Sequence, residues 1–121
     1  MDWKFSGSLP VYQQIKTQLQ GAVLAGTYPA GSRIPSVREL AAQAKVNPNT
    51  MQRALTELEH EGLLECHGTL GRCVTAEQTV LEQLRRNALD ALVRDCARRF
   101  REAGLTREQA SAMLLQLEKE A

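Results

Sequence analysis

Side chains that can form paired hydrogen bonds with nucleobases stand close together between Asn49 and Arg53. The amides of Asn49 and Gln52 suit adenine, and the guanidinium of Arg53 suits guanine. Thr50 adds a hydroxyl for a phosphate and a methyl group for thymine. A helical phase that buries Met51 leaves these four side chains exposed, and the start of such a helix itself favours a phosphate. The chemistry expected of this segment is therefore contact with DNA.

The net charge at first argues against such a partner, but its distribution does not. The 121 residues hold 15 Lys and Arg against 14 Asp and Glu, a formal net charge of +1. Residues 33–53 hold four basic residues and one acidic residue, whereas residues 54–65 hold four acidic residues and none that is basic. The charge is thus segregated, and a positive patch lies where the expected base-reading helix begins, which a net value conceals.

Two helices are expected before that segment. The first begins at Pro10, shows an apolar residue every four positions, and ends at a turn over residues 26–31; its apolar side is Val11, Ile15, Leu19 and Val23. Ser36 and Glu39 form a capping box that opens the second helix, which runs to about Ala44.

The base-reading helix and a hairpin follow. Asn47 is an expected N-cap with Pro48 at the first helical position, and Gly62 is placed to end a helix that reaches about Glu61. Two strands are then expected at 63–66 and 72–75, joined by a loop with two glycines. Two helices joined by a short turn and followed by a hairpin describe a winged helix-turn-helix, in which the second helix enters the major groove.

The C-terminal segment is expected to be helical throughout. Thr75 and Gln78 suggest a cap for a long helix that ends at Gly104, and Thr106 and Gln109 open a final helix. Two amphipathic helices do not readily bury both apolar stripes against each other, so a second copy of the chain is expected to cover them. The predicted fold is therefore mainly α with a small β-hairpin wing, divided into a DNA-binding domain (1–75) and a helical dimerisation segment (76–121).

Residues 34–64, IPSVRELAAQAKVNPNTMQRALTELEHEGLL, closely resemble the DNA-binding domain of the GntR family of bacterial transcription regulators. The P-S-x-R-x-L-A core, the V-N-x-x-T turn and A-L-x-x-L-x-x-E-G-L occur in the family's order and spacing, and PVYQQI (10–15) extends the resemblance over residues 9–75. The short helical C-terminal segment resembles the YtrA-type subfamily, whose members dimerise through two C-terminal helices. The resemblance implies a homodimeric repressor, often of a transporter operon. The two-fold symmetry of a homodimer then predicts a palindromic operator in double-stranded DNA.

The resemblance also implies which residues touch DNA. Ser36 and Arg38 match the contacts from the helix before the recognition helix, and the wing tip matches at His67 and Gly68. The recognition-helix positions are those named above: Asn49, Thr50, Gln52 and Arg53. The wing departs from the usual pattern, because it has fewer basic residues and Cys73 where the family commonly has Phe.

The residues expected to mediate dimerisation are apolar positions of the two C-terminal helices: Leu81, Leu84, Leu92, Phe100, Met113 and Leu117. No segment of the sequence forms a separate sensory domain. A small-molecule effector, if one exists, is therefore expected between the two parts of the chain or at the dimer seam, and the sequence does not identify it.

The sequence also contains features that suggest other functions. Cys66, His67 and Cys73 suggest a thiol- or metal-responsive wing, although no C-x-x-C and no fourth ligand are evident. A helical protein-interaction module is a further alternative. No catalytic motif occurs, so neither an enzyme nor a cofactor is expected. Without an apolar run of membrane-spanning length or a signal peptide, the chain is expected to be cytoplasmic, with no membrane partner.

Overall fold

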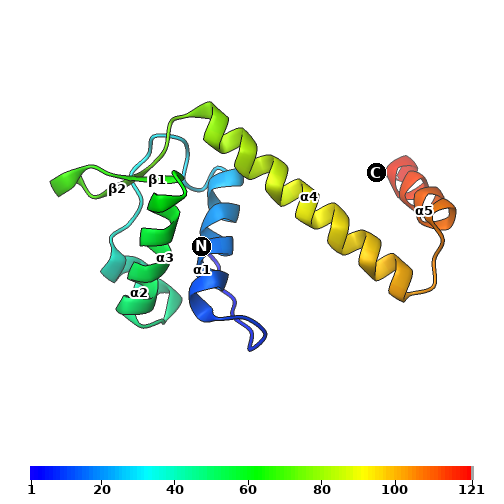
Figure 1. The fold of residues 1–121 in the computed structure, drawn as a ribbon, viewed down its shortest axis with the longest axis horizontal. Coiled ribbons are helices and arrows are strands. Elements are labelled where there is room, and N and C mark those ends of the chain that lie inside the picture. The colour runs from blue at the N-terminus through cyan, green and yellow to red at the C-terminus, as the bar shows by residue number, and fades with distance from the viewer. Residues whose placement is uncertain (121) are drawn as a thin grey trace. The chain divides into compact units, whose positions relative to one another are not determined.

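The computed structural model describes residues 1–120, which form two compact units (Figure 1). The head comprises Met1–Arg85, and the tail unit begins at Arg86. The head holds three helices and a hairpin, α1 (Val11–Leu24), α2 (Val37–Ala44), α3 (Pro48–His60), β1 (Leu64–Cys66) and β2 (Arg72–Val74). The predicted fold class, a mainly helical chain with a hairpin wing, is confirmed.

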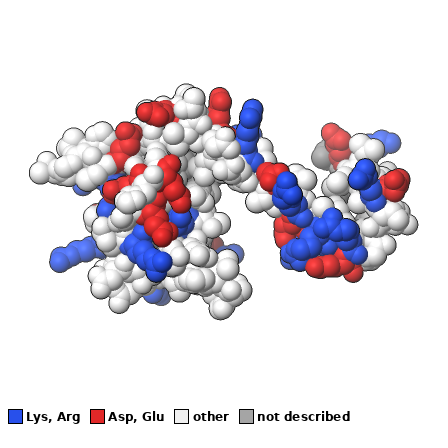
Figure 2. Space-filling model, in the orientation of Figure 1, with Lys and Arg blue, Asp and Glu red and all other residues white. Residues whose placement is uncertain are grey.

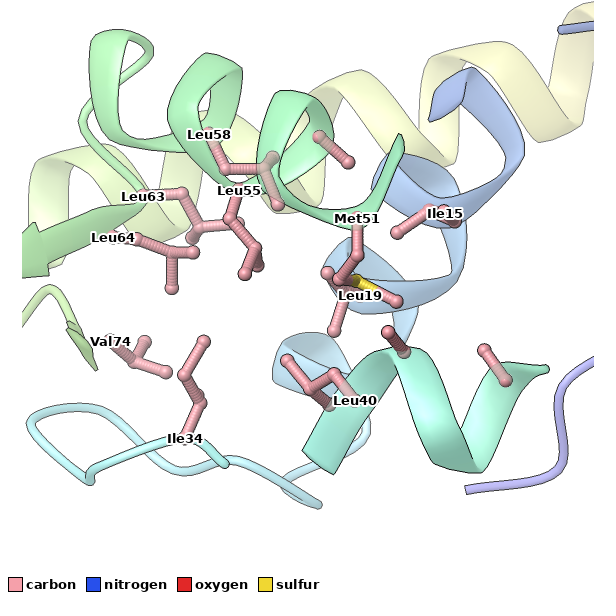
Figure 3. Close-up of a cluster of buried hydrophobic side chains, with 13 residues drawn as sticks. Ile15, Leu19, Ile34, Leu40, Met51, Leu55, Leu58, Leu63, Leu64 and Val74 are labelled. Atoms are coloured by element: carbon pink, nitrogen blue, oxygen red, sulfur yellow. The ribbon is translucent and has the colours of Figure 1, made fainter. Parts of the chain in front are cut away.

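One apolar core holds the elements of the head together (Figure 3). The buried face of α3 lies at its centre, and α1, α2 and the hairpin each add apolar side chains around it. The fully buried side chains include Ile15, Leu40, Met51, Leu55, Leu58 and Val74. Because these residues fix α3 on its apolar side, the opposite side of the helix is directed to solvent.

Local capping interactions set the starts of α2 and α3, as predicted. The Ser36 hydroxyl accepts from the backbone N–H of Glu39, and the Glu39 carboxylate accepts from the backbone N–H of Ser36, both at 3.2 Å. The Asn47 side chain accepts from the backbone N–H of Asn49 at 2.8 Å. Between the helices, Lys45 adopts the left-handed conformation at φ 58°, which makes the turn of the helix-turn-helix tight.

The wing is an antiparallel hairpin with a short 3₁₀ turn, η1 (Gly68–Leu70), at its tip. Leu64 pairs with Val74, and Cys66 pairs with Arg72. The segment before α2 adds to the other side of β2, where the backbone N–H of Ile34 donates to Arg72 and that of Val74 donates to Ser32. A two-stranded hairpin is marginally stable alone, so this added pairing ties the wing to the helix-turn-helix.

The helix α4 (Gln78–Glu102) begins in the head and continues into the tail unit. The expected cap by Thr75 is wrong in detail, because its hydroxyl accepts from the backbone N–H of Glu77, before the helix starts. Thr75 is itself buried, and its backbone N–H donates to Leu63, which joins the end of the wing to the end of α3. The first turns of α4 pack on the head core through Leu81 and Leu84.

The tail unit consists of the rest of α4 and α5 (Arg107–Glu120). Gly104, at φ 83°, ends α4, and Thr106 and Gln109 form the predicted capping box of α5. Of residues 86–120, only Ala110 is buried. The two helices of this unit therefore lack a core of their own.

Candidate nucleic-acid interface

The exposed side of α3 carries the predicted base-reading residues. Asn49, Gln52 and Arg53 are exposed, and Thr50 is half-buried. Gln52 donates from its amide to the hydroxyl of Thr56 at 3.3 Å, which leaves the amide oxygen and one N–H for other partners. The arrangement presents a row of hydrogen-bonding groups along the first turns of the helix, as base reading in the major groove requires.

Arg53 is held against α1 rather than extending freely into solvent. Its guanidinium carbon lies 3.6 Å from the centroid of the Tyr12 ring. The Glu57 carboxylate, one turn further along α3, lies 3.9 Å from Nε of Arg53. The Arg53 side chain nevertheless remains 60% exposed, so its N–H groups are open to a ligand.

The start of α2 supplies a second group of predicted contacts. The Ser36 hydroxyl accepts the capping hydrogen bond, but its own O–H is still able to donate to a phosphate. Arg38 is exposed in the first turn of the same helix. The backbone N–H of Ser36 holds the pKa of Glu39 below its ordinary value, with smaller contributions from the Ser36 hydroxyl and Arg33. Glu39 is therefore committed to the cap, and the basic side chains nearby face solvent.

The wing tip carries the predicted His67 and Gly68, both of which are exposed. The backbone N–H of His67 donates to the carbonyl of Gly71 at 2.8 Å and closes the loop. Gly68 and Gly71 have φ of 62° and 85°, which side-chain-bearing residues rarely adopt, so the tight tip depends on both glycines. Leu70, which sequence reasoning did not consider, is 65% exposed at this tip.

The only basic residue of the wing, Arg72, does not extend toward solvent. Its Nε donates to the carboxylate of Glu59 on α3. The two side chains are 17% and 25% exposed, so the ion pair is mostly buried. Arg72 thus fastens the wing to α3, and its positive charge is paired with the carboxylate of Glu59.

The alternative of a combined thiol and imidazole site in the wing is not supported by the register. Cys66 pairs with Arg72 and Cys73 with Glu65, and cross-strand partners share a face of the hairpin. Since residues 72 and 73 point to opposite faces, the two thiols do as well. Throughout the described residues 1–120, no three His, Cys, Asp or Glu side chains are grouped to hold a metal ion.

Acidic and basic side chains occupy different parts of the head surface. Figure 2 shows acidic side chains over the later turns of α3 and basic ones nearer to α2. Two of the acids are neutralised from α1, because Lys16 lies 3.2 Å from Glu57 and 2.5 Å from Glu61. The hydrogen bond to Glu61 raises the pKa of Lys16 above its ordinary value. The charge segregation read from the sequence is therefore present on the surface.

Tertiary contacts of this surface were missed by sequence reasoning. Tyr12 and Arg72 were assigned no role in the site, yet each contacts an expected DNA-binding element. The one local signal was that Tyr12 lies four residues before Lys16, on the side of α1 that faces α3. Their partners lie far away in sequence, so spacing did not reveal these contacts.

The fold and the exposed surface define a class of protein. A helix-turn-helix with a hairpin wing, and a recognition helix that exposes amide, hydroxyl and guanidinium groups, characterise a DNA-binding transcription regulator.

The chain belongs to the GntR family, since the model of bacterial regulatory proteins of the gntR family matches residues 11–74. It is 33% identical over 109 residues to the HTH-type transcriptional regulator YhcF of Bacillus subtilis, with 90% of each chain covered. It is 47% identical over 58 residues to the transcriptional repressor YtrA of the same organism, which covers 48% of this chain and 45% of YtrA.

Solved structures agree with this assignment. A GntR family transcriptional regulator from Listeria monocytogenes matches with a TM-score of 0.83 and 32% identity, over 93% of this chain and 98% of that one. The DNA-binding domain of AraR in complex with an operator matches with a TM-score of 0.57 and 28% identity, over 62% of this chain and 96% of that one. The protein is thus a DNA-binding transcription regulator of the GntR family and not an enzyme. None of the helices within residues 1–120 is long and apolar enough to cross a membrane.

Proposed function

We propose that the protein is a homodimeric repressor that binds a palindromic operator. Residues 1–75 serve as the DNA-binding domain and residues 76–121 as the dimerisation segment. Two copies place their α3 helices in successive major grooves, with half-sites about 10 bp apart or a multiple of that spacing. Repression follows when the dimer covers a promoter. The similarity to a relative named as a transcriptional repressor supports the direction of control.

The observation that best supports a dimer is the exposure of apolar side chains in the tail unit. Seven of its large apolar side chains are at least half exposed: Leu89, Leu92, Val93, Met113, Leu114, Leu115 and Leu117. An apolar groove of about 670 Å³ runs between α4 and α5 and is lined by residues such as Phe100 and Ala110. Burying half of a large apolar side chain contributes about 1 kcal/mol, so a second copy placed on these residues gains substantial free energy.

The predicted dimerisation residues fall into two groups. Leu92, Met113 and Leu117 are exposed in the tail unit, and Phe100 lines its groove. They are free to contact a second copy. Leu81 and Leu84 instead pack partly on the head core, so their part in the dimer is the less direct one.

On DNA, we assign the contacts by the chemistry of the exposed groups. Asn49, Thr50, Gln52 and Arg53 read or contact the major groove from α3. Ser36 and Arg38 bind phosphates beside α2, and His67 with Gly68 approaches the minor groove from the wing. The regulated genes are proposed to encode a transporter. The protein is proposed to act in the cytoplasm, and any effector is a small molecule.

Selection of bound duplexes from a random-sequence library tests the operator. We expect a palindromic consensus, and a consensus without two-fold symmetry would contradict the proposal. Between the selected duplex and versions of it with single base changes, Gln52→Ala and Arg53→Ala should relax base preference, whereas Arg38→Ala should weaken binding to all duplexes alike. Unchanged affinity in all three variants would refute the assignment of contacts.

The oligomeric state is tested by light scattering. We expect a dimer for the full chain and a monomer for Leu117→Asp, because a carboxylate on the apolar face opposes its burial. Truncation after Arg85 retains Leu81 and Leu84 on the head and should also be monomeric. If both variants remain dimeric, the interface lies outside the tail unit.

Binding that is insensitive to salt would favour a protein-interaction module instead of a DNA-binding one.

A further inference from the structure

The side chain of Arg53 has two neighbours with different effects on its position. Tyr12 of α1 stacks under the guanidinium at 3.6 Å, a cation–π geometry that suits arginine. Glu57 lies 3.9 Å from Nε, too far for a hydrogen bond. The aromatic ring, rather than the carboxylate, is therefore the closer support of the guanidinium.

Lys16 competes with Arg53 for the carboxylate of Glu57. Its ammonium lies 3.2 Å from one oxygen of Glu57, while the other oxygen faces Arg53 at 3.9 Å. The Lys16 side chain is 18% exposed and is held from its other side by Glu61 at 2.5 Å. The carboxylate of Glu57 is thus drawn toward α1, and the Arg53 side chain stays 60% exposed.

We propose that Tyr12 is a positioning residue for DNA recognition, which holds the Arg53 guanidinium over the α1 side of the recognition helix so that its N–H groups meet DNA in a fixed direction. This rests on the proposed function, in which Arg53 contacts the operator. A free arginine side chain loses rotational freedom when it binds, and a stacked one has lost much of it already. Tyr12 thereby contributes to affinity and base preference without touching DNA.

The test compares Tyr12→Phe, Tyr12→Leu, Arg53→Ala and the double variant Tyr12→Leu/Arg53→Ala in the full chain. The probes are the duplex selected with the wild-type protein and a scrambled duplex of equal length, measured by fluorescence anisotropy at one salt concentration. Phe keeps the aromatic face, and Leu keeps apolar volume without it. Thermal unfolding of each variant establishes that the head is folded under the binding conditions.

We expect Tyr12→Phe to bind the selected duplex as the wild type does, and Tyr12→Leu to bind it roughly 2- to 5-fold more weakly, the size typical of an exposed cation–π contact. In the Arg53→Ala background, Tyr12→Leu should change nothing further. Ring current should also shift the Arg53 Hδ protons upfield in the NMR spectra of the wild type and Tyr12→Phe, but not of Tyr12→Leu. The NMR shift reports the contact itself, whereas a merely structural role of Tyr12 does not predict that its effect on binding disappears in the Arg53→Ala background.

The outcomes separate this inference from the function on which it rests. If Arg53→Ala weakens binding but Tyr12→Leu and Tyr12→Phe bind the selected duplex with the same affinity, the positioning role is overturned and the DNA contact stands. If Tyr12→Leu weakens binding equally with and without Arg53, Tyr12 acts through the fold or through DNA directly, and the inference also fails. If Arg53→Ala binds the selected duplex as the wild type does, the assigned contact and the inference fail together.

Discussion

The ion pair between Arg72 of the wing and Glu59 of α3 makes a specific prediction about how the wing works. Arg72 is basic and lies in the hairpin, so it is a natural candidate for a phosphate contact. The structure instead shows it bonded to Glu59, with only 17% of its side chain exposed. We therefore predict that Arg72→Met weakens the fold of the head while leaving the number of phosphate contacts unchanged.

The expected size of the effect follows from the burial of the pair. Breaking a fully buried ion pair costs about 3–5 kcal/mol, whereas an exposed pair contributes about 0–1 kcal/mol. Exposures of 17% and 25% place this pair between those limits. We take the cost of Arg72→Met as about 2 kcal/mol, because Glu59 is left mostly buried without its partner. For a domain of this size that lowers Tm by roughly 8–16 °C.

The assay has two readouts on the full chain. Thermal unfolding followed by circular dichroism reports stability, and Glu59→Gln/Arg72→Met should recover part of the loss, because it leaves no unpaired carboxylate. Titration of DNA binding against salt reports phosphate contacts, since each one contributes about −0.9 to the slope of log K against log salt. An unchanged Tm together with a slope about 0.9 shallower would refute the reasoning and make Arg72 a DNA contact.

Three further substitutions have defined outcomes. Glu39→Gln keeps an acceptor for the Ser36 N–H without a titrating charge. The cap lowers the pKa of Glu39 below 4.5, so the stabilisation by its charge is present at neutral pH and lost in acid. The free energy of unfolding in urea should therefore fall more for the wild type than for the variant between about pH 6 and pH 3, and parallel profiles would contradict this. Lys16→Met should lower the free energy of unfolding near pH 9 and lower it progressively less above about pH 10.5. The reason is that Glu61 raises the pKa of Lys16, and the stabilisation is lost as Lys16 deprotonates. A difference between wild type and variant that stays constant with pH in urea titrations would rule this out. Lys45→Gly should raise stability by about 0.5–1 kcal/mol, because φ 58° suits glycine. Lys45→Ala, the control that removes the charge and the stem but keeps Cβ, should not, and equal Tm values for the two variants would show that the turn is unstrained.

The local structure of the head was predictable because its signals are short in range. The Ser36–Glu39 box and the Asn47 cap join residues that are two or three positions apart, so the sequence itself contains both partners. The apolar spacing around Met51 likewise predicted which side of α3 is exposed. The cap expected from Thr75 was wrong, because Thr75 is buried and its backbone pairs with Leu63, a tertiary contact that outweighs the local pattern.

The arrangement of the two cysteines shows the limit of spacing as a guide. Closeness of Cys66 and Cys73 along a short hairpin suggested a shared site, but the register assigns them to opposite faces. A shift of one residue in register would reverse that outcome, because side chains alternate along a strand. The register is set by the turn at the tip and by Leu64 and Val74, which are both buried in the core.

The class of fold, most of the helix starts, the side of α3 that meets solvent and the separation of basic from acidic residues could all be predicted from the amino-acid sequence. These depend on periodicity, caps and composition, which are properties of neighbouring residues. The partners of the charged side chains, in contrast, became visible only in the folded chain. Arg72 meets Glu59, Arg53 stacks on Tyr12, and Lys16 joins α1 to the acids of α3. Such contacts join segments brought together by burial of a common core, and therefore no local pattern encodes them.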